Sequence, residues 1–310
     1  MTEKAILFGE RQHLLGIVTE PGPGSRGSSC LVLLNAGLVH RVGPNRLHVK
    51  LARRMAARGW SVLRFDLSGI GDSGPGEETV SVSRQALRDI RAATEYVTSS
   101  LGVGRVFLAG ICLGADLAFQ AALEDDRVAG VALINGVELQ RQSPEAGDVP
   151  GSINAGADAE RERAHYADAR TRWRYYMTRL FRPRAWWRLV SGRSDWRSLR
   201  RTAGMLLRGR SRAGESSEDL VRRRDDCARM ISRGTRILLV LCEGSIAFDV
   251  YRLSYEAALA PLANAGGLRT EIMKHTDHVF TLQWSQSRLM EVMERWLEDS
   301  DPAGARAGGG

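Results

Sequence analysis

The chain has 310 residues, of which 43% are hydrophobic, and this fits one large α/β domain or a core domain with an inserted subdomain. The opening residues MTEKAILFGE lack the apolar core of a signal peptide. No stretch approaches the roughly 18 consecutive apolar residues of a membrane helix. These observations argue against an integral membrane protein and predict a soluble protein of the cytoplasm.

The net charge and the cysteines limit the partners and cofactors that the protein is expected to bind. A formal net charge of +8 suits an acidic partner, such as nucleic acid, an anionic membrane, a phosphorylated cofactor or an acidic carrier protein. No nucleic-acid recognition motif accompanies this charge, so nucleic acid is not expected as the partner. The four cysteines show neither CxxC pairing nor a metal-ligand spacing with the histidines. We therefore expect no zinc site, no disulfide framework and no cofactor.

Up to about residue 135, short apolar runs alternate with amphipathic segments, which predicts a mostly parallel, doubly wound sheet covered by helices on both faces. The runs at 4–9 and 14–21 are expected to pair as a hairpin. Leu47, Leu51 and Met55 share one face of the first expected helix. The other expected strands cover 30–37, 60–69, 105–110 and 128–137, and the expected helices cover 46–59, 82–102 and 113–125.

The pattern is then interrupted by an arginine-rich and tryptophan-rich segment, which we interpret as a helical lid over residues 140–232. An insertion at this point of a doubly wound sheet lies over the carboxyl ends of the strands, where such folds bind ligands. The core therefore divides into residues 1–139 and 233–299, followed by a disordered tail at 300–310. A strand at 236–244, the segment 269–278, which holds the last expected strand and the histidines after it, and a helix at 285–299 complete the second part.

The stretch VFLAGICLGADLAF places Cys112 at the centre of a G-x-C-x-G turn between a strand and a helix. Gly110 and Gly114 are needed there because a side chain at either position would strike the adjacent strand or helix. The helix start favours a thiolate, and the Leu113 N–H can donate to an oxyanion. Cys112 is thus the predicted nucleophile, although a small buried thiol at a tight turn explains the five residues alone.

A histidine follows the last expected strand, where an α/β fold with a strand-turn-helix nucleophile requires its base. We favour His278 because the following residues VFTLQW are expected to pack the loop onto the core. His275, three residues earlier, is the competing candidate.

The catalytic acid is the weakest part of the pattern. Ser245 occupies the position after the strand at 236–244 where a carboxylate is expected. Asp249 is the favoured acid and Glu243 the alternative, with Glu138 or no acid at all also open. A cysteine nucleophile tolerates this gap because the pKa values of thiol and imidazole are close, so an ion pair can form without a third group.

The loop after residues 30–37 carries the second oxyanion donor. Gly37 permits a sharp turn, which makes the Leu38 N–H the natural donor. His40 and Arg41 are candidates for binding a substrate carboxylate or phosphate, or for pairing with acidic residues of the lid. In the next loop, we expect Asp66 and Asp72 to stabilise the loop rather than to act in catalysis.

Together, the segment from LNAGLVH to GIGDSG, the turn GICLGA and the loop TDHVF resemble the α/β-hydrolase superfamily. The nearest branches are the serine aminopeptidase-like hydrolases and the hydrolases found with exosortase systems. The departures are Cys112, where these relatives have serine, and Ser245, where they have the acid. In having cysteine at the nucleophile position, the chain resembles dienelactone hydrolases and polyhydroxyalkanoate synthases.

The resemblance implies acyl transfer through a thioester acyl-enzyme, with an ester or thioester substrate. Because a thioester is more reactive toward amines and thiols than an oxygen ester is, an acyltransferase or cyclase competes with a hydrolase or thioesterase. The arginines of the lid would attract an acyl carrier protein or coenzyme A, or would form only a solvated helix face. The alternative is a catalytically retired hydrolase fold that serves as a binding protein.

Overall fold

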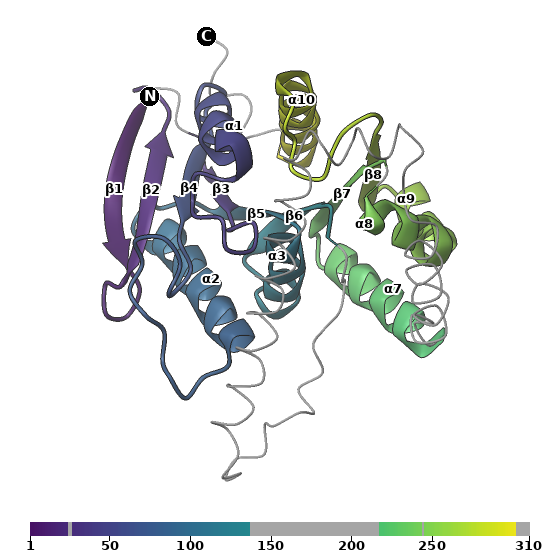
Figure 1. Cartoon of the computed structure of the whole chain (residues 1–310), viewed down its shortest axis with the longest axis horizontal. Coiled ribbons are helices and arrows are strands. Elements are labelled where there is room, and N and C mark those ends of the chain that lie inside the picture. The colour runs from purple at the N-terminus through teal and green to yellow at the C-terminus, as the bar shows by residue number, and fades with distance from the viewer. Residues whose placement is uncertain (24–26, 137–216, 244, 302–310) are drawn as a thin grey trace, which may run out of the picture.

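The computed structural model describes residues 1–23, 27–136, 217–243 and 245–301 of the chain (Figure 1). The range expected to form most of the lid, from residue 140 onward, therefore lies outside the described residues up to residue 216. Within the described ranges, no helix is both long enough and apolar enough to cross a lipid bilayer.

A sheet of eight strands forms the centre of the molecule, in the order β1-β2-β4-β3-β5-β6-β7-β8. β1 pairs antiparallel with β2, and β2 with β4, whereas all the other neighbours are parallel. This confirms the predicted hairpin and the mostly parallel sheet. The strands are β1 (Thr2–Phe8), β2 (Leu14–Glu20), β3 (Ser29–Leu33), β4 (Ser61–Phe65), β5 (Arg105–Ile111), β6 (Val128–Ile134), β7 (Arg236–Cys242) and β8 (Leu268–Met273).

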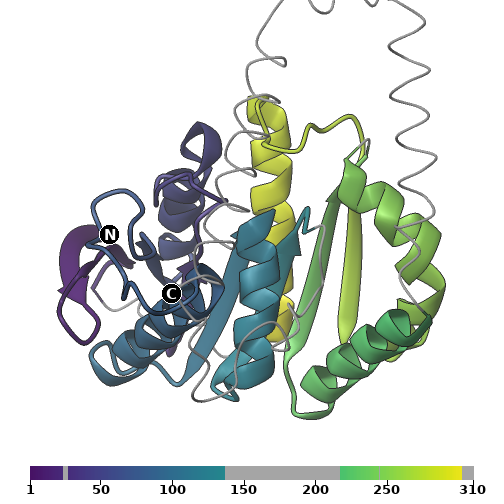
Figure 2. The ribbon, with the colours of Figure 1, turned by 60° about the horizontal axis from the view of Figure 1, so that its bottom comes forward.

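Helices cover both faces of the sheet, and Figure 2 shows α10 behind it and α3 in front. One face packs against α1 (Leu47–Ala56) and α10 (Gln283–Ser300). The other face packs against α2 (Val82–Ser99), α3 (Leu113–Glu124), α7 (Ser217–Ser232) and α9 (Glu256–Asn264). The doubly wound arrangement is thus as the alternating pattern predicts.

Apolar periodicity explains why these segments fold as they do. Leu47, Leu51 and Met55 are all buried, as expected for one face of α1. Strands β3 and β4 are buried at every position, which is typical of strands covered on both sides. Between the sheet and α10, the rings of Phe107 and Trp296 meet edge to face with centroids 5.7 Å apart.

Three elements after β7 have no counterpart among the expected elements: α8 (Ile246–Val250), η3 (Tyr251–Tyr255), which is a wider π-helical turn, and α9. Pro261 lies inside α9, and an internal proline removes one helical hydrogen bond and argues against a helix in the sequence. The packing of Leu259 and Tyr255 into the core compensates for that loss.

The end of the predicted lid at residue 232 and the start of the predicted tail at residue 300 both fall in segments that pack into the core. Helix α7, inside the range expected for the lid, places Cys227 and Met230 in the same apolar cluster as α3. At the other end, Asp301 is buried, accepts a hydrogen bond from Ser29 Oγ and pairs with Arg105 at 3.2 Å. The described part of the chain therefore stays packed through residue 301.

Candidate active site

The predicted catalytic residues follow the carboxyl ends of two parallel strands of the sheet, β5 and β8, which are separated by β6 and β7. Cys112 comes directly after β5, and His278 lies in the loop between β8 and α10. Since parallel strands end at the same edge of a sheet, these segments share one edge, where open α/β sheets bind their ligands.

The turn at Cys112 has the strained backbone of a nucleophile turn. Cys112 adopts φ 56° and ψ −123°, a conformation that L-residues rarely adopt. Its N–H donates to the Ile134 carbonyl at 2.8 Å, and its carbonyl accepts from the Ala115 N–H at 2.8 Å. The strain is therefore maintained by hydrogen bonds on both sides of the residue.

The two flanking glycines are required by close backbone contacts. A Cβ at Gly110 would lie 2.0 Å from the Gly114 carbonyl oxygen, and a Cβ at Gly114 would lie 2.4 Å from the Asn35 carbonyl oxygen. Real Cβ atoms do not approach backbone so closely. This confirms the argument from the G-x-C-x-G pattern, and it shows that the helix start is pressed against the loop that follows β3.

The Cys112 thiol differs from the expected thiolate. Burial raises its pKa to about 11, the carboxylate of Asp116 adds to that rise, and the Leu113 N–H opposes it. Asp116 lies in the first turn of α3, so its negative charge offsets the effect of the helix start. The prediction that the turn favours the thiolate is therefore wrong: the resting residue is a neutral thiol at neutral pH.

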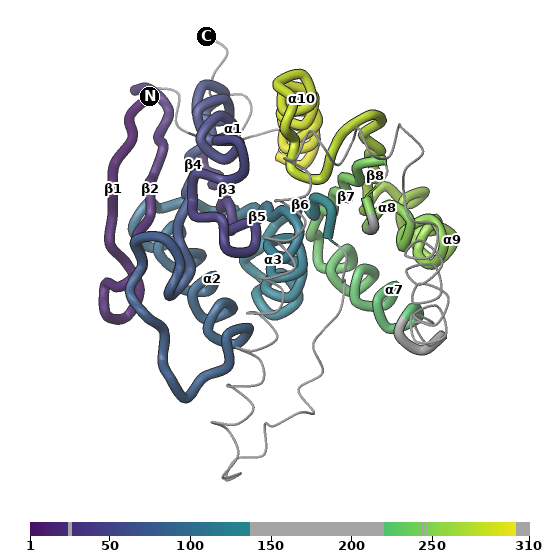
Figure 3. Tube along the Cα trace, viewed as in Figure 1, coloured from purple at the N-terminus to yellow at the C-terminus, as the bar shows by residue number. Residues whose placement is uncertain are grey.

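The loop that carries His278 is anchored to the core, as its apolar sequence predicts. Figure 3 shows the chain passing from β8 to the start of α10 through this loop. Phe280 is fully buried, and Val279 is 8% exposed. The Asn45 Nδ2 donates to the Val279 carbonyl at 3.1 Å, and Asp277 accepts from the Thr281 N–H at 2.9 Å. The half-buried His278 thus sits on a constrained segment.

The imidazole of His278 is in its neutral form at neutral pH. Burial lowers its pKa below the ordinary value, and the neighbouring Asp277 opposes that shift. Within the ranges that the structure describes, no hydrogen bond joins the His278 ring to Cys112 or to a carboxylate. Both shifts favour a neutral thiol and a neutral imidazole over a preformed ion pair. The expectation that an ion pair replaces the missing acid is therefore not met in this state.

Among the residues described, neither candidate acid forms a hydrogen bond or ion pair with His278. Asp249 is exposed in α8, and Glu243 is exposed at the end of β7, where it accepts from the His275 N–H at 3.3 Å. Ser245 is buried and caps α8 by accepting from the Phe248 N–H at 3.2 Å. The position of the expected acid thus has a structural role. Glu138, the further alternative, lies outside the described residues.

Of the two expected oxyanion donors, the Leu113 N–H lies within hydrogen-bond reach of the Cys112 sulfur. The N–H groups of Leu38 and Leu113 donate to no backbone or side-chain oxygen among the residues described. Gly37 has φ 59°, as the sharp turn requires, and the Asn35 side chain fixes this loop by donating to the Val39 carbonyl at 3.0 Å. Leu38 and Leu113 as the oxyanion hole stay a prediction, which this geometry permits.

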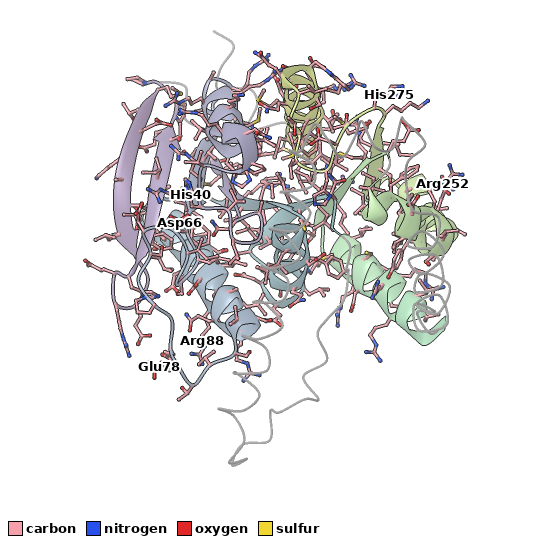
Figure 4. All side chains as sticks on the ribbon, viewed as in Figure 1. His40, Asp66, Glu78, Arg88, Arg252 and His275 are labelled. Carbon is pink, nitrogen blue, oxygen red and sulfur yellow. The ribbon has the colours of Figure 1, made fainter. Side chains whose placement is uncertain are left out.

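Of the two candidate substrate ligands, Arg41 is engaged within the protein and His40 is exposed. The Arg41 guanidinium donates to the buried Asp66 and to Asp72, the latter at 2.6 Å. Figure 4 shows His40 and Asp66 near each other, on the other side of α10 from His275. The expectation that Asp66 and Asp72 stabilise the loop is confirmed. Arg41 as a substrate ligand stays a prediction, but its observed partners are these two carboxylates.

Two residues of the site were not predicted from the sequence. Asn135, directly after β6, is fully buried and donates to the His278 carbonyl at 3.1 Å. Asp116 lies close enough to Cys112 to raise the pKa of the thiol. The signal for Asn135 is a polar residue at the end of the apolar run VALI; the signal for Asp116 is its spacing of four residues from Cys112, which is one helical turn.

The described residues hold no group of three or more side chains suited to a metal ion.

The model of the serine aminopeptidase S33 family matches residues 32–147, a range that contains Cys112. No curated protein matches the chain.

Several solved structures are similar over nearly their whole length. Est1E from Butyrivibrio proteoclasticus with bound ferulic acid is 12% identical, with 93% of this chain and 96% of that chain covered and a TM-score of 0.55. An esterase from Pyrococcus furiosus is 15% identical, with 95% and 90% covered and a TM-score of 0.53. Proline iminopeptidase from Mycobacterium smegmatis is 16% identical, with 97% and 99% covered and a TM-score of 0.50. At such identities the likeness concerns the fold. Together with the strand order, these findings show that the chain has the α/β-hydrolase fold.

Proposed function

We propose that the protein is a cysteine-dependent acyl-transfer enzyme that acts on an ester or thioester. The single observation that carries this proposal is the strained turn at Cys112, whose backbone hydrogen bonds and flanking glycines hold the thiol at the catalytic edge of the sheet. Strain of this kind persists where the surrounding structure enforces it, and it is concentrated at functional sites. The Pyrococcus furiosus esterase among the similar structures supports chemistry at an ester carbonyl.

In the proposed reaction, the Cys112 sulfur attacks the carbonyl carbon while His278 takes the thiol proton. The N–H groups of Leu38 and Leu113 stabilise the negative oxygen. The bond from the carbonyl carbon to the leaving group then breaks, and the proton on His278 passes to the leaving oxygen or sulfur. The product is a thioester acyl-enzyme. Because thiol and imidazole are both neutral at rest, the proton moves during the attack rather than before it.

The acyl-enzyme is resolved by water or by an organic acceptor. Hydrolysis makes the protein a hydrolase or thioesterase; transfer to an amine, alcohol or thiol makes it an acyltransferase or cyclase. We favour transfer because a thioester reacts readily with amines and thiols. Release of the acyl group in water, with and without an added amine or thiol, measures the partition directly.

As the acyl donor we propose a thioester on coenzyme A or on an acidic acyl carrier protein. The net charge of +8 supports an anionic donor. Two exposed cations, Arg46 and Lys274, flank the loop that carries His278, and neither forms an ion pair with the residues described. Arg46 adjoins Asn45, which bonds the Val279 carbonyl, and Lys274 directly follows β8.

The donor is tested by reversing these two charges. Arg46→Glu with Lys274→Glu should lower kcat/KM for an acyl carrier protein thioester about tenfold at low salt, and leave an uncharged N-acetylcysteamine thioester unchanged. Lys4→Glu, an exposed lysine on the edge strand β1, is the matched control. Equal loss with both donors would contradict a docking role for the two cations.

The catalytic proposal itself is tested by intact mass. Incubation with an activated acyl thioester should add one acyl group, which Cys112→Ala abolishes and His278→Ala slows at least a hundredfold. Cys112→Ser should keep the fold and shift the balance toward hydrolysis. No adduct at Cys112 over the pH range 6 to 10 would contradict acyl transfer.

A binding protein without catalysis is the competing proposal. It is favoured by the raised pKa of Cys112 and by the absence of a carboxylate bonded to His278 in the described part of the chain. The same mass experiment decides between the two, because a retired site would leave the thiol unacylated.

A further inference from the structure

The main-chain N–H and the side-chain amide of Asn135 are engaged in hydrogen bonds in the space between β6, β7 and the loop from β8 to α10 that carries His278 (the histidine loop). Asn135 is fully buried, and its N–H donates to the Val240 carbonyl at 2.8 Å. Its Oδ1 accepts from the Cys242 N–H at 2.8 Å. Its Nδ2 donates to the His278 carbonyl and to the Cys242 sulfur, both at 3.1 Å. One side chain therefore connects three segments at the catalytic edge.

Ile134, the residue before Asn135, is hydrogen-bonded to Cys112, the proposed nucleophile. The Ile134 carbonyl accepts from the Cys112 N–H at 2.8 Å. Ile134 and Asn135 are consecutive, and consecutive Cα atoms are fixed about 3.8 Å apart by the planar peptide. The end of β6 is thus hydrogen-bonded to the backbone of Cys112 through one residue and to the backbone of His278 through the next.

The chemistry of this position requires asparagine. A primary amide carries an acceptor for the Cys242 N–H and donors for the His278 carbonyl in one short side chain, whereas aspartate has no donor. Asn135 also adopts φ 50°, a left-handed conformation in which asparagine is enriched. Loss of the amide leaves the part-buried His278 carbonyl without its side-chain donor.

We propose that Asn135 is a positioning residue that sets the place of His278 relative to Cys112. This inference rests on the proposed acyl transfer. In the described part of the chain no carboxylate orients the imidazole, so the main chain of the loop, rather than a third catalytic side chain, holds the base in reach of the thiol.

Two variants test the role. Asn135→Gly keeps the left-handed backbone and removes the amide; Asn135→Asp keeps the acceptor for Cys242 and places an oxygen against the His278 carbonyl. Cys242→Ala is the matched control, because it removes the sulfur bonded to Asn135 and leaves the bond to His278. The full-length proteins are first compared by circular dichroism to establish that they are folded.

Two measurements follow. Carbethoxylation of His278 by diethyl pyrocarbonate at pH 7.5, followed by peptide mass, reports on the loop without any need for catalysis. We expect it to be at least fivefold faster in both Asn135 variants and unchanged in Cys242→Ala. Acylation of Cys112 by an N-acetylcysteamine thioester should lose about a hundredfold in kcat with KM within twofold, since a displacement of about 1 Å costs about that much.

The outcomes separate the two proposals. Wild-type protein that is not acylated at Cys112 contradicts the proposed function, and the carbethoxylation rates still decide whether Asn135 holds His278. The inference is overturned if either folded Asn135 variant keeps wild-type rates in both measurements, or if Cys242→Ala loses as much as Asn135→Gly.

Discussion

The turn after β5 and the turn after β7 lie at the same edge of the sheet, but they are constrained in different ways. At the first, Gly110 and Gly114 bring backbone against backbone, and three hydrogen bonds hold Cys112 in a strained conformation. At the second, Ser245 caps a short helix, and the nearby carboxylates are exposed. The comparison shows that backbone packing fixes the position of Cys112, the proposed nucleophile, whereas the position of a catalytic acid would depend on the conformation of a single side chain.

The largest effect is expected where the backbone contacts are closest. Gly110→Ala should lower the free energy of unfolding by about 3 kcal/mol, because the new Cβ would overlap the Gly114 carbonyl. Urea unfolding measures the change. In the control Gly22→Ala, the added Cβ would lie 3.7 Å from Met1, an ordinary contact, so stability should stay within about 0.5 kcal/mol. Equal stability of both variants would contradict the role given to backbone packing.

The second largest effect is expected from the negative charge of Asp116, which lies near the Cys112 thiol. The rate of alkylation of Cys112 by iodoacetamide follows the thiolate fraction, so it should rise about tenfold per pH unit from pH 7 to 10, because burial raises the pKa of the thiol to about 11. Asp116→Asn removes a negative charge that disfavours the thiolate. It should therefore raise the rate at pH 7 by up to about tenfold, since one pKa unit is a factor of ten.

Peptide mapping distinguishes Cys112 from the other three cysteines, all of which are buried. Glu124→Gln, at the opposite end of α3, is the matched control and should leave the rate unchanged. A rate that levels off by pH 8 would show that the thiolate is already formed, contrary to the neutral thiol described above.

The third effect tests the turn after β7. Ser245→Ala should cost about 1 kcal/mol in the free energy of unfolding, because the Phe248 N–H loses its cap. Ser245→Asp should retain stability, since aspartate caps helices as well as serine does. Its carboxylate would be held by the helix, so acylation of Cys112 should change less than threefold. Acceleration of tenfold or more would show instead that the position is an acid site that a carboxylate can still fill.

The same contrast explains what the sequence predicts. Local backbone geometry restricts which residue types can occur at a position, so it can be predicted from the sequence. The two glycines around Cys112 and the apolar run before it predict the turn. The apolar periodicity of α1 predicts the helix. These features depend on local geometry and on periodic burial. The fold and the strained turn at Cys112 could therefore be predicted, as could the anchoring of the histidine loop by Val279 and Phe280.

The side-chain contacts that the sequence did not predict depend on distances between segments far apart in the chain. Asn135 contacts His278 across 143 positions of the sequence, and nothing local marks that contact. Asp116 is within one turn of Cys112, but whether its charge acts on the thiol depends on burial. The reach of Asp249 and Glu243 likewise follows from the folding of α8, which the sequence pattern did not reveal. Single side-chain contacts are thus the least predictable level of the structure.

The smallest effects are expected at the two candidate acids. Asp249→Asn and Glu243→Gln should each change the rate of Cys112 acylation less than threefold, because both side chains are exposed and neither bonds the His278 ring. Glu243→Gln should have the larger effect of the two, since Glu243 accepts from the His275 N–H at 3.3 Å and thereby contacts the histidine loop. Acylation kinetics with an N-acetylcysteamine thioester measure both. A loss of a hundredfold or more in Asp249→Asn alone would establish Asp249 as the catalytic acid, as its place in the sequence predicts, and would mean that α8 approaches His278 when substrate binds.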